Sequence, residues 1–210
     1  DHRDLHSFPT RRSSDLLDAD DDAQLIFESL NSTGLALTEA DKIRNYLLMS
    51  LTAEEQQLCF KNYWQKIESA TENNPTKFLR DYLTIKQQLQ RPVRLSNIYF
   101  EWKKYMDGRD RKQEMVEMLD YARYYQQVTE AQMETSKLSA KMRHICNIES
   151  DVTNVFFIQF LKYAATNNLS YDEIDKVIDV VENYLARRII CNMPGNALTQ
   201  IGRASCRERV

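Results

Sequence analysis

Histidine and cysteine, the side chains that most often bind transition metals or act as nucleophiles, are few in this chain and far apart. Cys59, Cys146 and Cys191 are widely separated, Cys206 lies in the last ten residues, and His144 is the one histidine beyond the first ten residues. A zinc site needs several such ligands together, and a lone histidine without a partner carboxylate or cysteine is usually packed or solvated. The sequence therefore predicts no metal site and no catalytic residue, and we assign His144 no role.

A polar loop, Asn31-Ser32-Thr33-Gly34, joins two segments that have helical periodicity. Gly34 can adopt the positive φ that reverses the chain, and Thr38 is placed to cap the next helix, which carries Arg44. The predicted helix–loop–helix therefore has amide and hydroxyl groups at its apex. These groups are candidates for binding a ligand. Such a loop is also a common way to end one helix and start the next, and local chemistry favours this structural interpretation.

Apolar residues recur at three- and four-residue steps between the few glycine and proline residues, a pattern typical of amphipathic helices. The clearest stripe consists of Ile174, Val177, Ile178, Val181, Leu185, Arg188 and Ile189. We expect helices at about 20–30, 39–51, 53–70, 75–90, 96–107, 110–130, 136–147, 151–167 and 171–192. Short connectors then predict an all-α bundle of about nine helices with mostly antiparallel neighbours. The helix at 151–167 is apolar nearly all round, so we expect it to be central and buried.

Start and stop signals agree with this periodicity. Three capping boxes are predicted, at Thr38-x-x-Asp41, Thr52-x-x-Glu55 and Ser170-x-x-Glu173, and Asn74-Pro75 predicts a further helix start. Gly108 and Gly195 fit left-handed helix stops.

Aromatic and basic side chains have a functional and a structural interpretation. Tyr121, Tyr124, Tyr125 and the cluster Tyr99-Phe100-Trp102-Tyr105 could stack on nucleic-acid bases, but single-strand binders combine such rings with strong positive charge. We therefore expect these rings in the core. Arg187-Arg188 could contact DNA phosphate or a further domain, but cations in the last turn of a helix also stabilise its dipole, and we favour that role.

The two ends of the chain have a non-biological signature. Residues 6–15 can be read as codons whose reverse complement translates into residues 201–210. No folding requirement links two peptides through opposite strands of one oligonucleotide, whereas a sequencing adapter ligated to both ends of a DNA fragment does. We therefore expect 1–16 and 201–210 to be adapter-derived or doubtful, unstructured tails, and residues 17–200 to be an internal fragment of a larger protein.

Composition excludes several classes of function. Without the six basic and four acidic residues of the two ends, 22 basic and 27 acidic residues are left, a net charge of −5. A mildly acidic domain lacks the positive surface potential that is typical of nucleic-acid-binding domains, so its non-specific affinity for DNA should be weak. No stretch approaches a membrane span of roughly 20 apolar residues. The scattered cysteines predict reduced, buried thiols in a cytoplasmic protein.

One segment is distinctive. Residues 23–48, AQLIFESLNSTGLALTEADKIRNYLL, resemble the end of the ParB/sulfiredoxin-like N-terminal domain of GmrSD-type restriction endonucleases, long catalogued as a domain of unknown function. Three further segments are similar to the same family and follow in the expected order: Tyr63-Trp64-x-x-Ile67-Glu68, Phe78-Leu79-Arg80-Asp81-Tyr82-Leu83 and Glu182-Asn183-Tyr184-Leu185-x-Arg187-Arg188. In that family a helical region follows the N-terminal domain and precedes an HNH nuclease.

The resemblance implies a part of a type IV, modification-dependent restriction endonuclease in phage defence. Residues 17–51 would be the end of the N-terminal domain, and residues 52–200 the helical connector. The family's Asp-Gly-Gln-Gln-Arg nucleotide motif and its HNH histidines have no match here, so the fragment is expected to be inactive and to hold no cofactor. Nucleotide and divalent metal would belong to the parent protein.

The same resemblance implies where a ligand would lie and which partners the chain has. Asn31, Ser32, Thr33, Gly34 and Arg44 would lie at the edge of the parent's nucleotide pocket, with Arg44 contacting a phosphate. The partners would be the N-terminal and HNH domains of the same parent chain, with DNA reached only through the parent and no membrane. The alternative is a non-enzymatic helical protein-interaction module.

Overall fold

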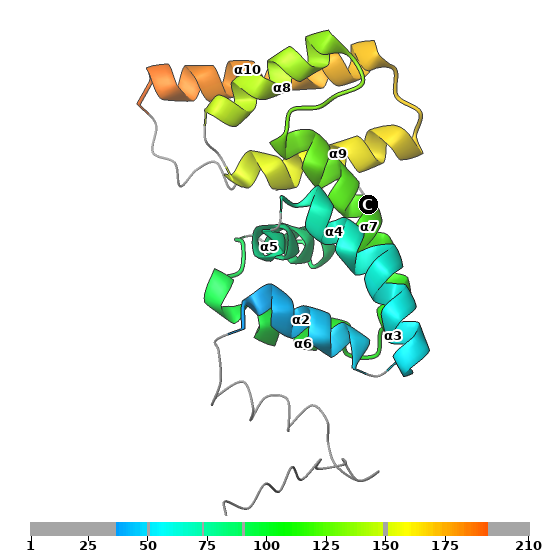
Figure 1. Ribbon diagram of the computed structural model, residues 1–210. Helices are drawn as coiled ribbons and strands as arrows, with labels where there is room; N and C mark the ends of the chain where they lie inside the picture. Colours follow the sequence, from blue (N-terminus) through cyan, green and yellow to red (C-terminus); the bar gives the residue numbers. More distant parts are fainter. Residues whose placement is uncertain (1–36, 50, 73, 90, 149–150, 193–210) are drawn as a thin grey trace, which may run out of the picture. The chain divides into compact units, whose positions relative to one another are not determined.

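The computed structural model describes residues 37–49, 51–72, 74–89, 91–148 and 151–192 (Figure 1). Contacts divide the chain after Ala36, and every described residue belongs to the second unit. The helix predicted at 20–30, the loop Asn31-Ser32-Thr33-Gly34, Gly195 and both predicted tails lie outside the described residues.

Eight helices account for the secondary structure of the described ranges, which contain no strand. One of them is continuous but carries three labels, α3, the π-helical turn η1 and α4. The bounds are α2 Glu39–Leu48, α3 Ala53–Cys59, η1 Phe60–Trp64, α4 Gln65–Ala70, α5 Pro75–Lys86, α6 Ile98–Met106, α7 Arg111–Thr129, α8 Ser136–Asn147, α9 Asp151–Thr166 and α10 Tyr171–Ile190; the 3-10 turn η2, Leu95–Asn97, leads into α6. The predicted all-α bundle is confirmed.

The helix starts follow the sequence signals. Thr38, Thr52 and Ser170 each accept a hydrogen bond from the backbone three residues later, and the carboxylate at that position bonds back, so all three capping boxes are confirmed. Pro75 is the first residue of α5, as predicted, but the Asn74 side chain makes no capping bond.

The helix ends depend on left-handed residues, most of which are not glycine. Gly108 follows α6 with φ +70°, as predicted. Five other helices of the described part end in the same way, at Glu72, Gln88, Ala131, Asn168 and Asn192, which have φ between 48° and 53°. The predicted ends of α4, α7, α9 and α10 lie within two residues of the observed ones, whereas α5 ends four residues before the predicted position, because a Cβ disfavours this conformation and Gln88 gives no sign of the stop.

The π-helical turn is a second departure from the expected regular helix. The backbone N–H of Gln65 donates to the carbonyl of Phe60, five residues earlier. Cys59 and Trp64, also five residues apart, are both buried. Residues at that spacing point in different directions on a regular α-helix, so the wider turn brings both side chains to the core face.

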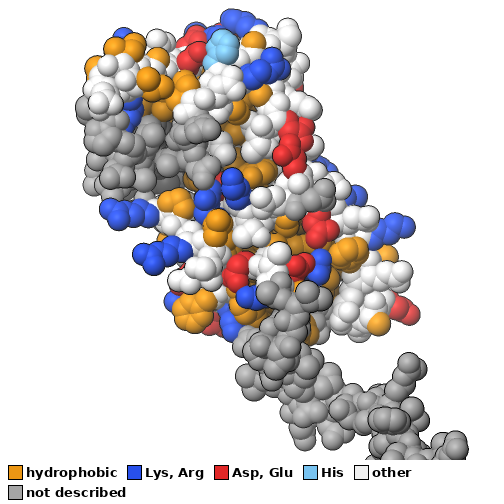
Figure 2. Space-filling model, turned by 60° about the vertical axis from the view of Figure 1, so that its left-hand side comes forward, with side chains coloured by type: hydrophobic (Ala, Val, Ile, Leu, Met, Phe, Trp, Pro, Cys, Tyr) orange, Lys and Arg blue, Asp and Glu red, His pale blue; other side chains and the backbone are white. Residues whose placement is uncertain are grey.

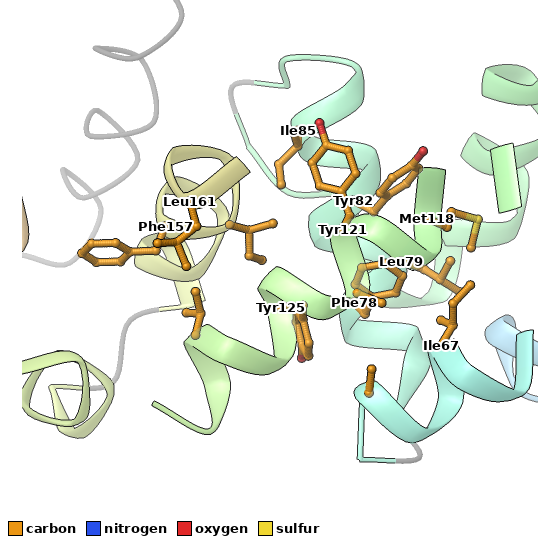
Figure 3. Packing of buried hydrophobic residues seen from close by; sticks show 14 of the residues in the cluster. Ile67, Phe78, Leu79, Tyr82, Ile85, Met118, Tyr121, Tyr125, Phe157 and Leu161 are labelled. Atoms are coloured by element: carbon orange, nitrogen blue, oxygen red, sulfur yellow. The ribbon is translucent and has the colours of Figure 1, made fainter. Parts of the chain in front are cut away.

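The core forms around α7, which packs against α4, α5 and α9. Edge-to-face ring pairs line it: Tyr82 with Tyr121, with ring centroids 5.2 Å apart, and Phe78 with Tyr125, at 5.5 Å (Figure 3). Each such pair adds about 0.5–1.5 kcal/mol to the free energy gained from burial. The expected core position is therefore confirmed for Tyr121 and Tyr125, whereas Tyr124 is half-buried.

Helix α9 packs against α7 and α5, but it is not buried all round as predicted, since Tyr163 is 51 % exposed. Phe157, Ile158 and Leu161 are buried, and Figure 3 shows Phe157 and Leu161 within the packed cluster. The predicted stripe of α10 is also buried over most of its length, including Arg188 in the last turn, but Ile189 is 60 % exposed.

Candidate functional site

Of the five residues predicted to edge a nucleotide pocket, only Arg44 lies in the described part of the chain. It is on α2, and its guanidinium contacts two carboxylates: Nη2 lies 3.0 Å from Asp41 Oδ1, and Nη1 lies 3.4 Å from Glu68 Oε1. Glu68 Oε1 also accepts a hydrogen bond of 2.6 Å from Trp64 Nε1. Arg44 therefore joins the first turns of α2 to the helix that carries the π-helical turn.

The geometry of this group determines what Arg44 can do. Asp41 is held by the Thr38 cap through its other oxygen, Oδ2, so its position relative to Arg44 is fixed. Glu68 makes the longer of the two ion pairs, and all three charged side chains are about a quarter exposed. Partly exposed ion pairs of this kind are weak, so a phosphate could compete for Arg44. The predicted phosphate contact stays a prediction.

A second polar group lies inside the core, and nothing in the sequence singled it out. Glu114 Oε1 accepts hydrogen bonds from two phenols, Tyr82 Oη and Tyr105 Oη, the second at 2.6 Å. All three side chains are buried, with at most 7 % exposed. Arg109 lies over the Tyr105 ring, 4.3 Å from its centroid. We call Tyr82, Tyr105 and Glu114 the buried knot.

Electrostatics keep both phenols protonated. Burial is the largest cause that raises the pKa of Tyr82 far above its usual value, and the hydrogen bond to Glu114 and its negative charge raise it further. The pKa of Tyr105 is raised for the same reasons in the same order. A phenol that holds its proton so firmly is a poor acid or base near neutral pH. The buried knot therefore acts as a structural group, in which two donors compensate one buried carboxylate.

A third polar group is a row of ion pairs between α8 and α10. Lys137 lies 2.6 Å from Asp175, and Lys141 lies 2.6 Å from the other oxygen of Asp175 and also pairs with Asp179. His144 Nδ1 lies 3.1 Å from Glu182 Oε1. We call these contacts the charge ladder. Since its pairs advance along both helices together, α8 and α10 run parallel, side by side (Figure 1).

The charge ladder corrects one premise of the sequence analysis. His144 does have a partner carboxylate, Glu182, which is 38 residues away in the chain. The histidine side chain is 64 % exposed, so it is solvated, as expected.

Other predicted positions are confirmed or corrected by burial. Trp102 and Tyr105 are in the core as predicted, but Phe100 is 57 % exposed, with Lys104 Nζ 4.2 Å from its ring centroid. All three described cysteines are free, but they differ in burial: Cys59 is buried, Cys146 is half-buried and Cys191 is exposed, so the prediction of buried thiols is wrong for Cys191.

The two arginines near the end of α10 differ. Both lie in its last turn, as the dipole interpretation requires. Arg188 is buried against Tyr184, with Nη1 3.2 Å from the phenol oxygen, whereas Arg187 is exposed. Only Arg187 is therefore placed to meet a partner without rearrangement.

The charged side chains and the possible metal ligands do not gather into one distinctive surface site. On the face that Figure 2 shows, acidic and basic side chains are interspersed. Within the described ranges, no three His, Cys, Asp or Glu side chains come together as a metal site would require. None of the helices described here is both long and apolar enough to cross a membrane.

The fold and these three groups define an all-α, multi-helix domain whose conspicuous polar side chains pair with one another. No family model, curated protein or solved structure matches the chain.

Proposed function

We propose that this chain carries the helical connector of a GmrSD-like, modification-dependent restriction endonuclease, a cytoplasmic phage-defence enzyme. In this role it lies between a nucleotide-sensing domain and an HNH nuclease domain, which supply the nucleotide and divalent-metal chemistry. The chain contributes no reacting group of its own.

One observation carries the proposal: two of the segments that resemble the family meet in space. Arg44 belongs to the first of them, residues 23–48, and Glu68 to the second, Tyr63-Trp64-x-x-Ile67-Glu68. The two side chains form an ion pair, and Trp64 of the second segment donates to the same carboxylate oxygen. Segments inherited together as one functional unit are expected to contact each other in this way.

The same contact suggests how a connector would work. Glu68 Oε1 is shared by Arg44 and Trp64, so a phosphate that draws Arg44 away would leave Trp64 as the sole neighbour of Glu68 in this group. Trp64 ends the π-helical turn and is buried. A change of ligand state at Arg44 would thus reach the packing of the helix that contains η1.

The test begins with the complete gene from which the sequence derives. We expect an Asp-Gly-Gln-Gln-Arg motif upstream and an HNH pattern downstream. In the complete protein, Arg44→Ala should lower nucleotide hydrolysis or its coupling to cleavage by about tenfold or more, the effect of losing one charged contact. Lys42→Ala, on the same helix, is the matched control. A complete gene without either motif would overturn the proposal.

A non-enzymatic interaction module is the second candidate, because α10 has exposed apolar side chains. Val180 is 70 % and Ile190 is 82 % exposed. A complete gene that encodes helical segments alone would favour this candidate.

A further inference from the structure

Helix α10 has three sides, two of which are occupied. Ile174, Ile178, Val181 and Leu185 are buried in the core, and the acidic residues of the charge ladder face α8. The remaining side lies open along the helix and centres on Val180, which is 70 % exposed. We call it the open face, and it comprises Glu173, Lys176, Val180, Asn183, Tyr184 and Arg187.

The charged and aromatic residues of the open face are spaced symmetrically along the sequence about Val180. Glu173 lies seven residues before it and Arg187 seven residues after it. Seven residues make nearly two turns, so these three residues lie along one line of the helix. Lys176 lies four residues before Val180 and Tyr184 four residues after it, on either side of that line.

This arrangement is complementary to itself when two helices run antiparallel. Each Glu173 then meets the Arg187 of the other copy, and each Lys176 meets a Tyr184 ring, a cation–π contact. Val180 meets Val180. In a parallel pair, like charges would meet at 173, 176 and 187, which disfavours association.

Two of the groups that would pair across the contact, Arg187 and Glu173, are available for it, whereas the Tyr184 hydroxyl already lies 3.2 Å from Arg188 Nη1. Arg187 is exposed and takes part in no ion pair within the described ranges. Glu173 uses Oε2 for its bonds to Ser170, and Oε1 has no part in that cap.

We propose that α10 is a self-association surface, through which two copies of this chain pair antiparallel about a two-fold axis that passes Val180. The contact is limited to one helix face, so the surface area that it buries is below the roughly 1,200 Å² of a standard interface. Association is therefore expected to be weak, with a Kd of micromolar order or above. The proposal does not depend on the proposed function.

Sedimentation of the 210-residue chain tests for the surface. The weight-average mass of the unmodified chain should rise with concentration, and Val180→Glu should weaken self-association about tenfold or more because it places two carboxylates at the axis. Ile189→Glu is the matched control, because Ile189 is exposed but lies on the opposite side of α10. Equal masses for the unmodified chain and Val180→Glu at every concentration would overturn the proposal.

Charge reversal tests the pairing. Arg187→Glu and Glu173→Arg should each weaken self-association, and an equimolar mixture of the two variants should restore it, because both contacts across the axis are again between opposite charges. Circular dichroism checks that each variant stays folded, since Glu173 also belongs to the helix cap. A mixture that associates no better than its two components would contradict the pairing.

Cysteine crosslinking tests the orientation, with Cys191 and Cys206 replaced by serine. When Lys176→Cys and Tyr184→Cys chains of different mass are mixed and oxidised, the antiparallel pair predicts disulfides between the two variants. Disulfides between two copies of the same variant would indicate a parallel pair and overturn the proposal.

Discussion

Replacing Tyr82 by phenylalanine removes one of the two donors to the buried carboxylate of Glu114 and leaves the ring that packs against Tyr121. The buried knot predicts a large effect from the loss of this single oxygen. A hydrogen bond to a charged group contributes about 1.5–3 kcal/mol, and Tyr82 is 1 % exposed, so water cannot take the place of the hydroxyl. We expect the free energy of unfolding to fall by that amount.

The second donor makes the prediction sharper. Tyr105→Phe alone should also destabilise the fold, and the double variant should lose about 3–5 kcal/mol, because an uncompensated buried carboxylate remains. Adding Glu114→Met should then recover much of that loss, since the charge that needed the donors is gone. A recovery of stability in the triple variant would show that the loss in the double variant comes from the unpaired charge. If the loss came from poor packing, a third substitution in the core would lower the stability further.

Urea unfolding followed by circular dichroism measures these differences. The matched control is Tyr163→Phe, because Tyr163 is exposed on α9 and its hydroxyl should contribute less than about 0.5 kcal/mol. If Tyr82→Phe and Tyr163→Phe are equally stable, or if Glu114→Met worsens the double variant, the interpretation of the buried knot is wrong.

Three further predictions concern pH and helix ends. Because the pKa of Tyr82 and of Tyr105 is raised, their contribution to the free energy of unfolding is complete below about pH 10 and falls at higher pH, by up to about 1.4 kcal/mol per pH unit each. The loss of stability with rising alkaline pH should be less steep in Tyr82→Phe, and an unchanged slope would contradict this. Gln88→Gly should add about 0.5–1 kcal/mol to the free energy of unfolding, measured in urea, because φ is 51° at this position and glycine adopts a positive φ without strain. A lower free energy of unfolding would show that Gln88 is not strained. The pKa of Asp175 is lowered by its hydrogen bond to Lys137, so its contribution is present above about pH 4 and lost as pH falls; thermal melts of Asp175→Asn should depend less on pH between about 5 and 3 than those of the unmodified chain, and parallel curves would exclude the charge ladder as a source of stability.

The helices could be predicted because their signals are local. A capping box such as Ser170-x-x-Glu173 needs only neighbouring residues, and every helix expected from residue 39 onward is present. The end of α5 was less predictable, because Gln88 adopts a left-handed conformation that its side chain does not favour. The π-helical turn was not predicted either, since it satisfies the burial of both Cys59 and Trp64.

The polar groups could be predicted only in part, because they join distant residues. The partners Tyr82 and Glu114 are 32 residues apart, and no spacing rule connects them. The charge ladder did leave a signal: its basic residues and its acidic residues follow the same steps of four and then three along their helices. Matching the charge spacing of two predicted helices would have found the partner of His144.

The most direct test of the account is to assay the purified chain beside the product of the complete gene for nucleotide hydrolysis and for cleavage of modified DNA. We predict activity in the complete protein and none in the chain, in which Glu114 pairs with two phenols and the acidic residues of the charge ladder pair with α8. Turnover by the chain alone, abolished by a single substitution within residues 37–192, would contradict the claim that it is a connector.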